Sequence, residues 1–249
     1  MSTVTVITPA YNAAQYLSDT IRSVQAQTFK DWEMIIVDDC STDETFKIAT
    51  SFSNKDFRIH VVKHTINSGV AVARNTALDA AKTKFVAFLD SDDLWMPNKL
   101  EKQLDFMEKN GYVLTYTDYQ LFNTDTEEVI KKIKSPKKMT YKSIFTNTGI
   151  GCLTVMVNKN ISGEFHMPLL KHTEDNCTWQ TILKPGYTAY LLDENLASYR
   201  IGNVSLTKDK SKSAKNQWDY YRKYYKFSVL KSAYYFCGYA INAVKKHYF

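Results

Sequence analysis

Hydrophobic positions in the first 110 residues follow two alternating spacings. Apolar and β-branched runs that end in polar residues predict four strands, at residues 3–9, 33–39, 58–64 and 84–90. Apolar residues at steps of three and four predict helices at residues 14–27, 43–52, 67–81 and 97–107. Ser41 and Thr42 are residue types that cap the second of these helices. We therefore expect an α/β fold, with a Rossmann-like, mostly parallel central sheet flanked by helices.

Beyond residue 110 the pattern loosens, without a repeat or a low-complexity linker. Further strands are predicted at residues 111–123, 151–158 and 187–200, and a short helix ends at Pro185 and Gly186. We expect one continuous domain over residues 1–207, with two halves that meet near residue 110. A helical C-terminal appendage, residues 208–249, would follow this domain.

Charge is distributed unevenly between the domain and the appendage. The chain of 249 residues has a net charge of +6, but residues 208–249 carry ten Lys or Arg against two Asp. The domain is therefore slightly acidic and the appendage strongly basic. Four scattered cysteines without a CxxC pair argue against a disulfide framework and against a zinc site. The N-terminus lacks the features of a secretion signal, so we expect a cytosolic protein.

Acidic and polar clusters follow three of the four strands predicted in the first half. These strand ends read "TPAYN", "VDDCS" and "LDSDD", and ligands of such sheets bind at the carboxyl ends of strands. Asp90, Asp92 and Asp93 repel one another unless a cation neutralises them. Carboxylate oxygens are the ligands that magnesium and manganese prefer. An Asp at a strand end can also simply cap the next helix, so the cluster is a stronger metal signal than any single residue.

Four ordered motifs identify a family. "VTVITPAYNAAQYLSDTIRSVQAQTFKDWEMIIVDDCSTDET", "NSGVAVARN", "FLDSDD" and "TEDNCTW" resemble the family-two inverting glycosyltransferases with the glycosyltransferase-A fold. The resemblance covers roughly residues 3 to 200 and is closest to bacterial enzymes of cell-surface polysaccharide synthesis. It implies a nucleotide-sugar-binding half at residues 1–110 and an acceptor-binding half at residues 111–207. The chain lacks the Q-x-x-R-W signature of processive relatives, which favours addition of single sugars.

The resemblance also implies site residues for the donor, a nucleotide-diphosphate sugar that we expect to be a UDP-sugar. Asp92, with Asp90, matches the family's ligands for Mn²⁺ or Mg²⁺. The metal would neutralise the charge on the departing nucleotide diphosphate. The implied nucleotide-binding residues are Pro9, Ala10, Tyr11, Asp38, Asp39, Gly69, Arg74, Asp90 and Ser91.

Asp175 matches the catalytic base of the family, and Glu174 is expected to support it. Carboxylates in the first turn of a helix are stabilised by the helix dipole, so Asp175 is expected to stay ionised and accept a proton. Acids are also common at helix N-termini for stability alone. The polar stretch from Arg200 to Asn216 is predicted to be a lid, in which Arg200 and nearby lysines meet the diphosphate. A plain surface loop is the alternative.

Three other functions compete with this interpretation. A nucleotidyltransferase would need a glycine-rich phosphate loop after the first strand, and "TPAYNAAQY" has no glycine. A nucleic-acid-binding protein could use the basic tail, but it would leave the acidic motifs unused, so we expect no nucleic acid partner. A sugar-nucleotide-binding scaffold without catalysis is disfavoured by the acids at Asp39, Asp92 and Asp175.

The basic tail carries a mostly apolar stripe at helical spacing. Together with the lysines and arginines it favours peripheral contact with an anionic membrane, where a lipid-linked glycan acceptor would be found. Packing of the stripe on the protein's own core is the alternative. The apolar run is too short to span a bilayer, so the tail would lie on the inner face of the cell membrane. The stripe comprises Trp218, Tyr221, Tyr225, Val229, Ser232, Phe236, Ala240 and Ala243.

Overall fold

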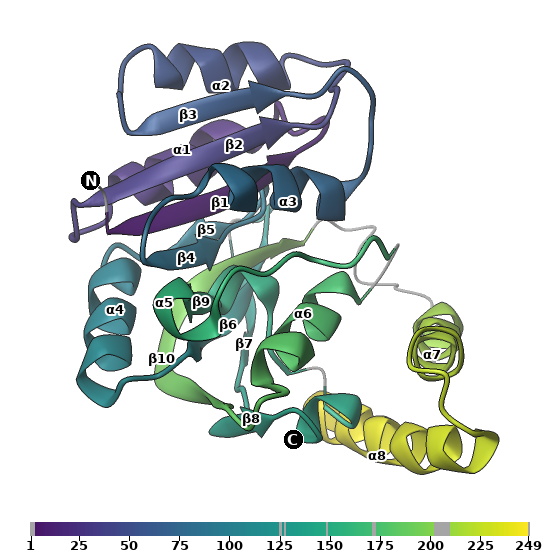
Figure 1. Ribbon diagram of the computed structural model, residues 1–249. Helices are drawn as coiled ribbons and strands as arrows, with labels where there is room; N and C mark the ends of the chain where they lie inside the picture. Colours follow the sequence, from purple (N-terminus) through teal and green to yellow (C-terminus); the bar gives the residue numbers. More distant parts are fainter. Residues whose placement is uncertain are drawn as a thin grey trace.

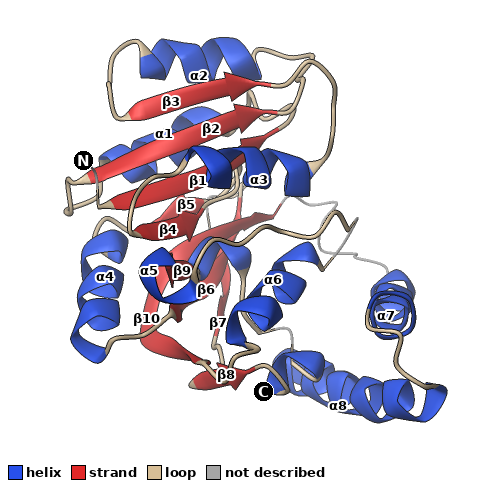
Figure 2. Ribbon diagram, viewed as in Figure 1, coloured by secondary structure: helices blue, strands red, loops and turns tan. Residues whose placement is uncertain are grey.

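A single mixed β-sheet forms the centre of the protein (Figures 1 and 2). The computed structural model describes residues 3–124, 126, 128–147, 149–170, 173–201 and 210–248, and for residues 210–213 and 244–248 it describes the backbone only. The sheet order is β3-β2-β1-β4-β9-β6-β10-β5, with β7 paired to β6 and β8 paired to β10. The strands are β1 Val4–Ala10, β2 Trp32–Asp38, β3 Ile59–Lys63, β4 Phe85–Phe88, β5 Leu94–Trp95, β6 Leu114–Asn123, β7 Val129–Ile133, β8 Lys138–Thr140, β9 Met156–Asn158 and β10 Thr188–Ile201.

The expectation of a mostly parallel sheet is correct only for the first half of the chain. Strands β3, β2, β1 and β4 are mutually parallel. Strand β9 then runs antiparallel to both β4 and β6, and β5, β7 and β8 also pair antiparallel. The parallel pairing of β6 with β10 is the exception in the second half. Strand β6 passes into β7 through a short connection, which permits only antiparallel pairing, whereas the other antiparallel partners are far apart in the chain.

Helices cover both faces of the sheet (Figure 2). One hydrophobic core contains residues of α3 and α6, and a second core, on the opposite face, contains residues of α1, α2 and α4. Strand β4 serves both cores, because Val86 and Phe88 belong to the first and Phe85 and Ala87 to the second. These helices are α1 Leu17–Gln25, α2 Thr45–Ser53, α3 Val70–Ala80, α4 Lys99–Asn110, α5 Lys159–Ser162 and α6 Glu174–Leu183.

Two local predictions need correction. The segment predicted as a strand at residues 151–158 begins with a 3₁₀ turn, η2 Cys152–Thr154, and only its end is strand β9. Ser41 and Thr42 do not cap α2, which begins later. Instead the Ser41 hydroxyl accepts a hydrogen bond from the Asn12 backbone N–H at 3.0 Å, and Asn12 Oδ1 accepts one from the Thr42 N–H at 2.9 Å. These residues therefore join the loops after β1 and β2.

The C-terminal segment forms two helices, α7 and α8. Helix α7 Lys210–Asp219 continues into a π-helical turn, Tyr220–Tyr224, and α8 Val229–Tyr248 follows after a reversal at Lys226, whose φ is 52°. Much of the expected stripe faces the domain. Tyr221 of the stripe, and Tyr220 beside it, are buried with Phe145, of the 3₁₀ turn η1 Ser143–Phe145, and with Cys177 of α6. None of the helices within the described residues is long and apolar enough to cross a membrane.

Candidate active site

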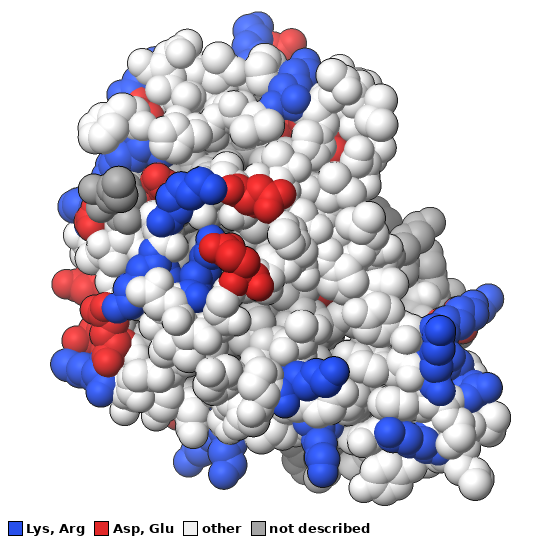
Figure 3. All heavy atoms as spheres, in the orientation of Figure 1, with Lys and Arg blue, Asp and Glu red and all other residues white. Residues whose placement is uncertain are grey.

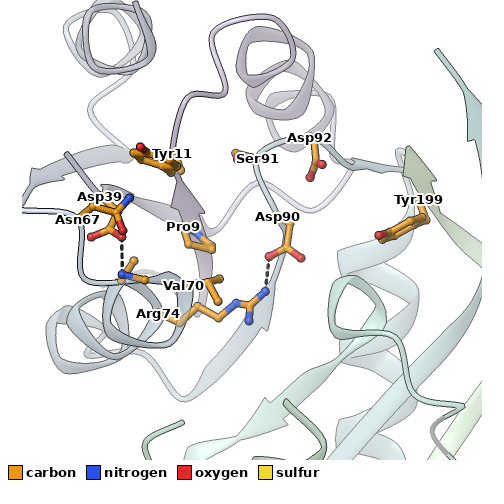
Figure 4. Close-up of a pocket in the computed structure, with 13 residues that line it drawn as sticks. Pro9, Tyr11, Asp39, Asn67, Val70, Arg74, Asp90, Ser91, Asp92 and Tyr199 are labelled. Carbon is orange, nitrogen blue, oxygen red and sulfur yellow. Dashed lines mark hydrogen bonds and ion pairs between the residues drawn. The ribbon is translucent and has the colours of Figure 1, made fainter. Parts of the chain in front are cut away.

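The carboxyl ends of β1, β2 and β4 meet at one edge of the sheet and line a cavity of about 410 Å³ (Figure 4). The strands converge because β1 pairs in parallel with both neighbours, with Ile7 opposite Phe88 and Ala10 opposite Asp38. We call this space the donor cavity. Its lining residues are Pro9, Ala10, Tyr11, Asp39, Asn67, Gly69, Val70, Ala73, Arg74, Asp90, Ser91, Asp92 and Tyr199.

Asp39 shapes the loop that borders this cavity. Its carboxylate accepts hydrogen bonds from the backbone N–H groups of Ser68 and Gly69, the latter at 2.7 Å, and from His64 Nδ1 at 2.7 Å. Burial acts to raise the pKa of Asp39, but these hydrogen bonds outweigh it and hold the pKa below its ordinary value. Gly69 has a φ of 91°, a conformation that favours glycine, and so lets the chain turn from this loop into α3.

Asp38 differs from the other predicted nucleotide-binding residues. Its side chain is fully buried, its two carboxylate oxygens have no hydrogen-bond partner among the described residues, and it does not line the donor cavity. The reason is that neighbouring residues of a strand point to opposite faces of a sheet, and Asp38 is the last residue of β2. The structure therefore separates the side chain of Asp38 from that of Asp39, and a role for Asp38 at the nucleotide stays a prediction.

Arg74 connects three of the predicted motifs. From the middle of α3 its buried guanidinium reaches Asp90 Oδ1 through Nη2 at 2.5 Å (Figure 4). It also reaches Glu174 Oε1 through Nη1 at 3.1 Å. Asp90 follows β4, and Glu174 begins α6, so the ion pairs hold α6 against the end of the sheet. A fixed, planar guanidinium is suited to two such partners at once.

A second cavity, of about 560 Å³, opens beside the first and contains both predicted catalytic acids. We call it the acceptor cavity. It shares Val70, Arg74, Asp90 and Tyr199 with the donor cavity, so the two spaces adjoin along this wall. The other lining residues are Tyr119, Ile150, Gly151, Cys152, Leu153, Thr173, Glu174, Asp175 and Asn176.

Asp175 is more easily protonated than an ordinary aspartate. Burial, followed by the charge of Glu174, raises its pKa to about 6, although Arg74 and a hydrogen bond from the Asn176 N–H at 2.7 Å oppose the shift. The expected stabilisation of the carboxylate by the helix dipole is thus outweighed by desolvation. A carboxyl group with a pKa near 6 is ionised at neutral pH and is still basic enough to accept a proton during a reaction.

The acidic loop after β4 is held from behind by α1. The Thr20 hydroxyl lies 3.0 Å from Ser91 O and 2.9 Å from Asp93 O. Asp93 is buried, and burial together with the charges of Asp92 and Asp90 raises its pKa well above the ordinary value. The mutual repulsion expected from the sequence is therefore present in the fold.

The residues at this loop fit a divalent cation whose coordination is completed by a ligand. Asp92 is exposed at the donor cavity, and no described residue donates a hydrogen bond to its carboxylate. Among the described residues there is no cluster of three or more His, Cys, Asp or Glu that could enclose an ion. Mg²⁺ and Mn²⁺ are often held by one or two carboxylates with substrate phosphates and water supplying the remaining oxygens, and Asp92 and Asp90 match this arrangement.

Arg200 lies at the back of the acidic loop and outside the lining of both cavities. It belongs to β10, and its side chain is held by Asp92 O, which accepts from Nε at 2.7 Å, and by the face of the Tyr16 ring at 4.7 Å. Its backbone N–H donates to Asp93 Oδ1 at 2.9 Å. Residues 202–209, nearly half of the predicted lid, lie outside the described residues, so the lid stays a prediction.

Sequence reasoning missed three residues of the site. His64 orients Asp39 and also lies 3.0 Å from Thr76 Oγ1 on α3, while Tyr199 lines both cavities and Tyr119 lines the acceptor cavity. His64 ends the third predicted strand, so the rule applied to the other strand ends would have found it. The tyrosines carry no comparable signal, because they sit within strands of the looser second half.

Comparison with known proteins identifies the family. Residues 5–161 match the family model described as Glycosyl transferase family 2. The chain belongs to this family. The resemblance inferred from the four motifs is thereby confirmed.

Two relatives match almost the whole chain. One is TuaG of Bacillus subtilis (strain 168), named as a candidate teichuronic acid biosynthesis glycosyltransferase, with 47% identity over 98% of this chain and 96% of TuaG. The other is WfgD of Escherichia coli, named UDP-Glc:α-D-GlcNAc-diphosphoundecaprenol β-1,3-glucosyltransferase, with 38% identity over 99% of this chain and 95% of WfgD. The chain is therefore similar over its full length to glycosyltransferases of cell-surface polysaccharides.

Solved structures show the same fold. A crystal structure of S. aureus TarS residues 1–349 in complex with UDP-GlcNAc has a TM-score of 0.68 and 22% identity, covering 88% of this chain and 64% of that one. The mannosyltransferase PcManGT from Pyrobaculum calidifontis, in complex with GDP-Man and Mn²⁺, has a TM-score of 0.68 and 17% identity, covering 97% of this chain and 73% of that one. The glycosyltransferase-A fold is confirmed.

Proposed function

We propose that this chain is an inverting, non-processive glycosyltransferase that adds a single sugar from a UDP-sugar to a lipid-linked glycan. The name of WfgD supports both the donor and the acceptor, since it specifies UDP-Glc as the donor and a GlcNAc-diphosphoundecaprenol as the acceptor. The name of TuaG supports a product of cell-surface polysaccharide synthesis, of the teichuronic type. The reaction would take place in the cytosol, at the inner face of the cell membrane. Family membership favours this function over a nucleotidyltransferase or a nucleic-acid-binding protein.

One observation carries the proposal: the donor and acceptor cavities share the wall formed by Val70, Arg74, Asp90 and Tyr199. A donor and an acceptor bound on the two sides would meet at this wall. Asp175 lies in the acceptor cavity, where it can reach a hydroxyl, while Asp92 lies in the donor cavity. Transfer with inversion needs this separation, because the base and the leaving group act on opposite sides of the anomeric carbon.

The donor cavity offers distinct groups to each part of a nucleotide sugar. Tyr11, half exposed at the rim, presents an aromatic face to the base. Asp39 holds the Ser68–Gly69 backbone in place against the same cavity and so shapes its floor. Arg74 keeps Asp90 oriented at the inner end. These residues would bind the donor and fix the direction in which the nucleotide diphosphate departs.

Asp175 would carry the proton transfer. An acceptor hydroxyl in the acceptor cavity loses its proton to a carboxylate oxygen of Asp175 as the hydroxyl oxygen bonds to the anomeric carbon. The bond from that carbon to the diphosphate oxygen breaks in the same displacement, so the configuration inverts. Glu174 is committed to Arg74, and it acts by holding the start of α6 rather than by accepting the proton.

Asp92 and Asp90 would hold a magnesium or manganese ion. When bound, such an ion acts as a Lewis acid that neutralises charge on the leaving diphosphate. The Mn²⁺ bound by the structural neighbour PcManGT supports this assignment. Arg74, which lines the donor cavity and pairs with Asp90, contributes further positive charge there.

The proposal is tested with Asp175→Asn and a panel of nucleotide sugars. The amide preserves the shape of the side chain but cannot accept the proton, so the rate of transfer should fall by about 10²–10⁴. Binding of the donor, measured by calorimetry, should change little. Asp105→Asn, an exposed carboxylate on α4, is the matched control and should transfer at the native rate. Native rates for Asp175→Asn would refute the assignment of the base.

The metal assignment is tested with Asp92→Ala and with chelation. The variant should bind both Mn²⁺ and UDP more weakly, because it loses the exposed carboxylate at the diphosphate end of the cavity. Manganese binding can be followed by electron paramagnetic resonance without any turnover. Excess chelator should silence the native enzyme until Mg²⁺ or Mn²⁺ is restored. Full transfer in excess chelator would remove the metal from the proposal.

A further inference from the structure

Helix α8 presents an apolar face to solvent. Leu230, Tyr234, Cys237 and Ile241 follow one another at steps of four, three and four residues, which places them along one side of the helix. Their exposure is high: 85% for Leu230, 72% for Tyr234 and 57% for Ile241. A helix on the surface of a soluble protein normally turns polar residues outward. The outward face of α8 instead carries apolar side chains of the kind that are normally buried.

The flank and the opposite side of α8 are fixed to the domain. Asn242 Nδ2 donates to Thr146 O at 2.9 Å, and Gly238 lies so close to Thr146 that a Cβ added there would approach the Thr146 Cγ2 to 2.6 Å. Ser232 is fully buried. The helix therefore cannot roll its apolar face inward without losing these contacts, and the exposure is built into the fold.

Basic side chains accompany this face, although one of them, Lys223, is paired with Asp219 at 2.9 Å. Lys226, at the reversal before α8, and Lys231, in its first turn, have no carboxylate within ion-pair distance in the described part of the chain. Lys231 Nζ lies 3.9 Å from the centre of the Phe227 ring. Arg222 and Lys223 lie in the π-helical turn just before them. Figure 3 shows blue side chains gathered over α7 and α8, at the lower right, with white surface between them.

We propose that the outward face of α8, with the cations of the preceding turn, docks on an anionic lipid surface. Apolar side chains and a tyrosine suit the boundary between headgroups and acyl chains, and lysines beside them suit acidic headgroups. The inference deepens the proposed function, and it rests on that function for the identity of the membrane. It also changes which residues would meet lipid. The stripe expected from the sequence contributes Tyr221 and Ser232 to the interior, and the lipid-facing residues are Leu230, Tyr234 and Ile241.

A second copy of the chain is the other candidate occupant of this face. The charges favour the lipid surface, because residues 208–249 carry ten Lys or Arg against two Asp, and a second copy of the chain would bring the same excess of positive charge. Like charges that face one another across an interface oppose association. An anionic bilayer instead satisfies the apolar face and the cations at once.

The test is cosedimentation of the full chain with vesicles that contain phosphatidylglycerol, at low salt. Leu230→Ser combined with Tyr234→Ser and Ile241→Ser should weaken binding by about tenfold or more. The double variant Lys226→Glu, Lys231→Glu should also bind these vesicles more weakly than the native protein. The difference in binding should grow as the fraction of anionic lipid rises. Purely phosphatidylcholine vesicles should bind the native protein more weakly than the anionic ones do.

A matched pair of single substitutions controls for the loss of surface hydrophobicity. Leu230→Ser should weaken vesicle binding, and Phe57→Ser should not, although Phe57 is 87% exposed. Phe57 lies between α2 and β3, at the far end of the molecule from α8 (Figure 1). Thermal unfolding of all variants should match that of the native protein, because the substituted side chains are exposed.

Three results would overturn the docking surface. They are vesicle binding by the triple serine variant at native affinity, no vesicle binding by the native protein at low salt, and a native dimer that the triple variant dissociates. The rate of sugar transfer to a water-soluble acceptor tests the proposed function independently of membrane binding. If the native protein binds vesicles through α8 but transfers no sugar, the docking surface stands and the glycosyltransferase proposal fails.

Discussion

Two aspartates of the site have opposite chemical characters, although both follow from short polar motifs. Asp39 receives backbone N–H groups and an imidazole, and its pKa is lowered. Asp175 is partly buried beside Glu174, and its pKa is raised to about 6. Active sites often contain two titratable groups whose pKa values are shifted in opposite directions by their surroundings, so that one stays charged and the other exchanges a proton. Asp39 is therefore suited to a fixed structural charge and Asp175 to a proton acceptor.

The pKa of Asp175 predicts how transfer depends on pH. A base must be deprotonated, so the rate at saturating metal should rise with pH, with an apparent pKa near 6, and reach a plateau above about pH 7. Below the apparent pKa the rate should fall about tenfold per pH unit. The measurement is the rate of transfer between pH 5 and pH 8. A rate that stays constant across this range would contradict the assignment.

The raised pKa of Asp175 also predicts how the stability of the folded protein depends on pH, which can be measured without any transfer reaction. Because the pKa of Asp175 in the folded protein lies above its unfolded value of 3.8, the folded state binds the proton more tightly. The stabilisation is complete below about pH 4 and is lost as the pH rises through about 6. Asp175→Asn should therefore gain thermal stability relative to the native protein at pH 7.5 and not at pH 4.

At the scale of elements, α6 is held from both ends. Arg74 pairs with Glu174 at its first residue. Six residues further on, Gln180 Oε1 accepts hydrogen bonds from the hydroxyl groups of Tyr220 and Tyr225 in the C-terminal segment. The helix that carries the proposed base thus depends on α3 and on the π-helical turn between α7 and α8. This is a physical link between the tail and the site.

The link predicts the effect of Gln180→Leu. The substitution removes the acceptor of two tyrosine hydroxyls, of which that of Tyr220 is buried, and an unsatisfied buried hydroxyl costs about 1–3 kcal/mol. The free energy of unfolding, measured with urea, should fall by about this amount. Adding Tyr220→Phe and Tyr225→Phe should restore most of the loss, because neither tyrosine hydroxyl is then left unpaired.

Tyr224→Phe is the matched control for this series. The Tyr224 side chain is more exposed than that of Tyr220, and loss of its hydroxyl should change the free energy of unfolding much less. If Gln180→Leu leaves stability unchanged, or if the phenylalanine variants do not recover it, the hydrogen bonds do not hold the tail on α6.

At the scale of the whole molecule, the tail is continuous with the body. Tyr220 and Tyr221 form a buried cluster with Phe145 and Cys177, and the Tyr221 hydroxyl donates to Phe145 O. The division of the chain into a domain at residues 1–207 and a tail at residues 208–249 stays a prediction. In space, the first part of the tail packs on the domain and α8 extends along its edge (Figure 1).

The sequence by itself determined the alternation of strands and helices up to residue 110 and the polar clusters at the strand ends. These features are local, because hydrophobic spacing reports the secondary structure of the segment that carries it. Parallel strands bring their carboxyl ends to one edge, so Pro9, Asp39 and Asp90 could be assigned to one site before any contact was known. The four motifs in order were enough to identify the family.

Only the tertiary structure decided what those groups do to one another. Arg74 and Glu174 are 100 residues apart in the chain, and their ion pair depends on how α3 and α6 pack on the sheet. The pKa of Asp175 follows from burial, which no spacing reports, and desolvation outweighed the helix dipole that the sequence suggested. The tail shows the same limit. A periodic pattern marks two sides of a helix, but only packing against Thr146 decided that Leu230 and Ile241 face outward.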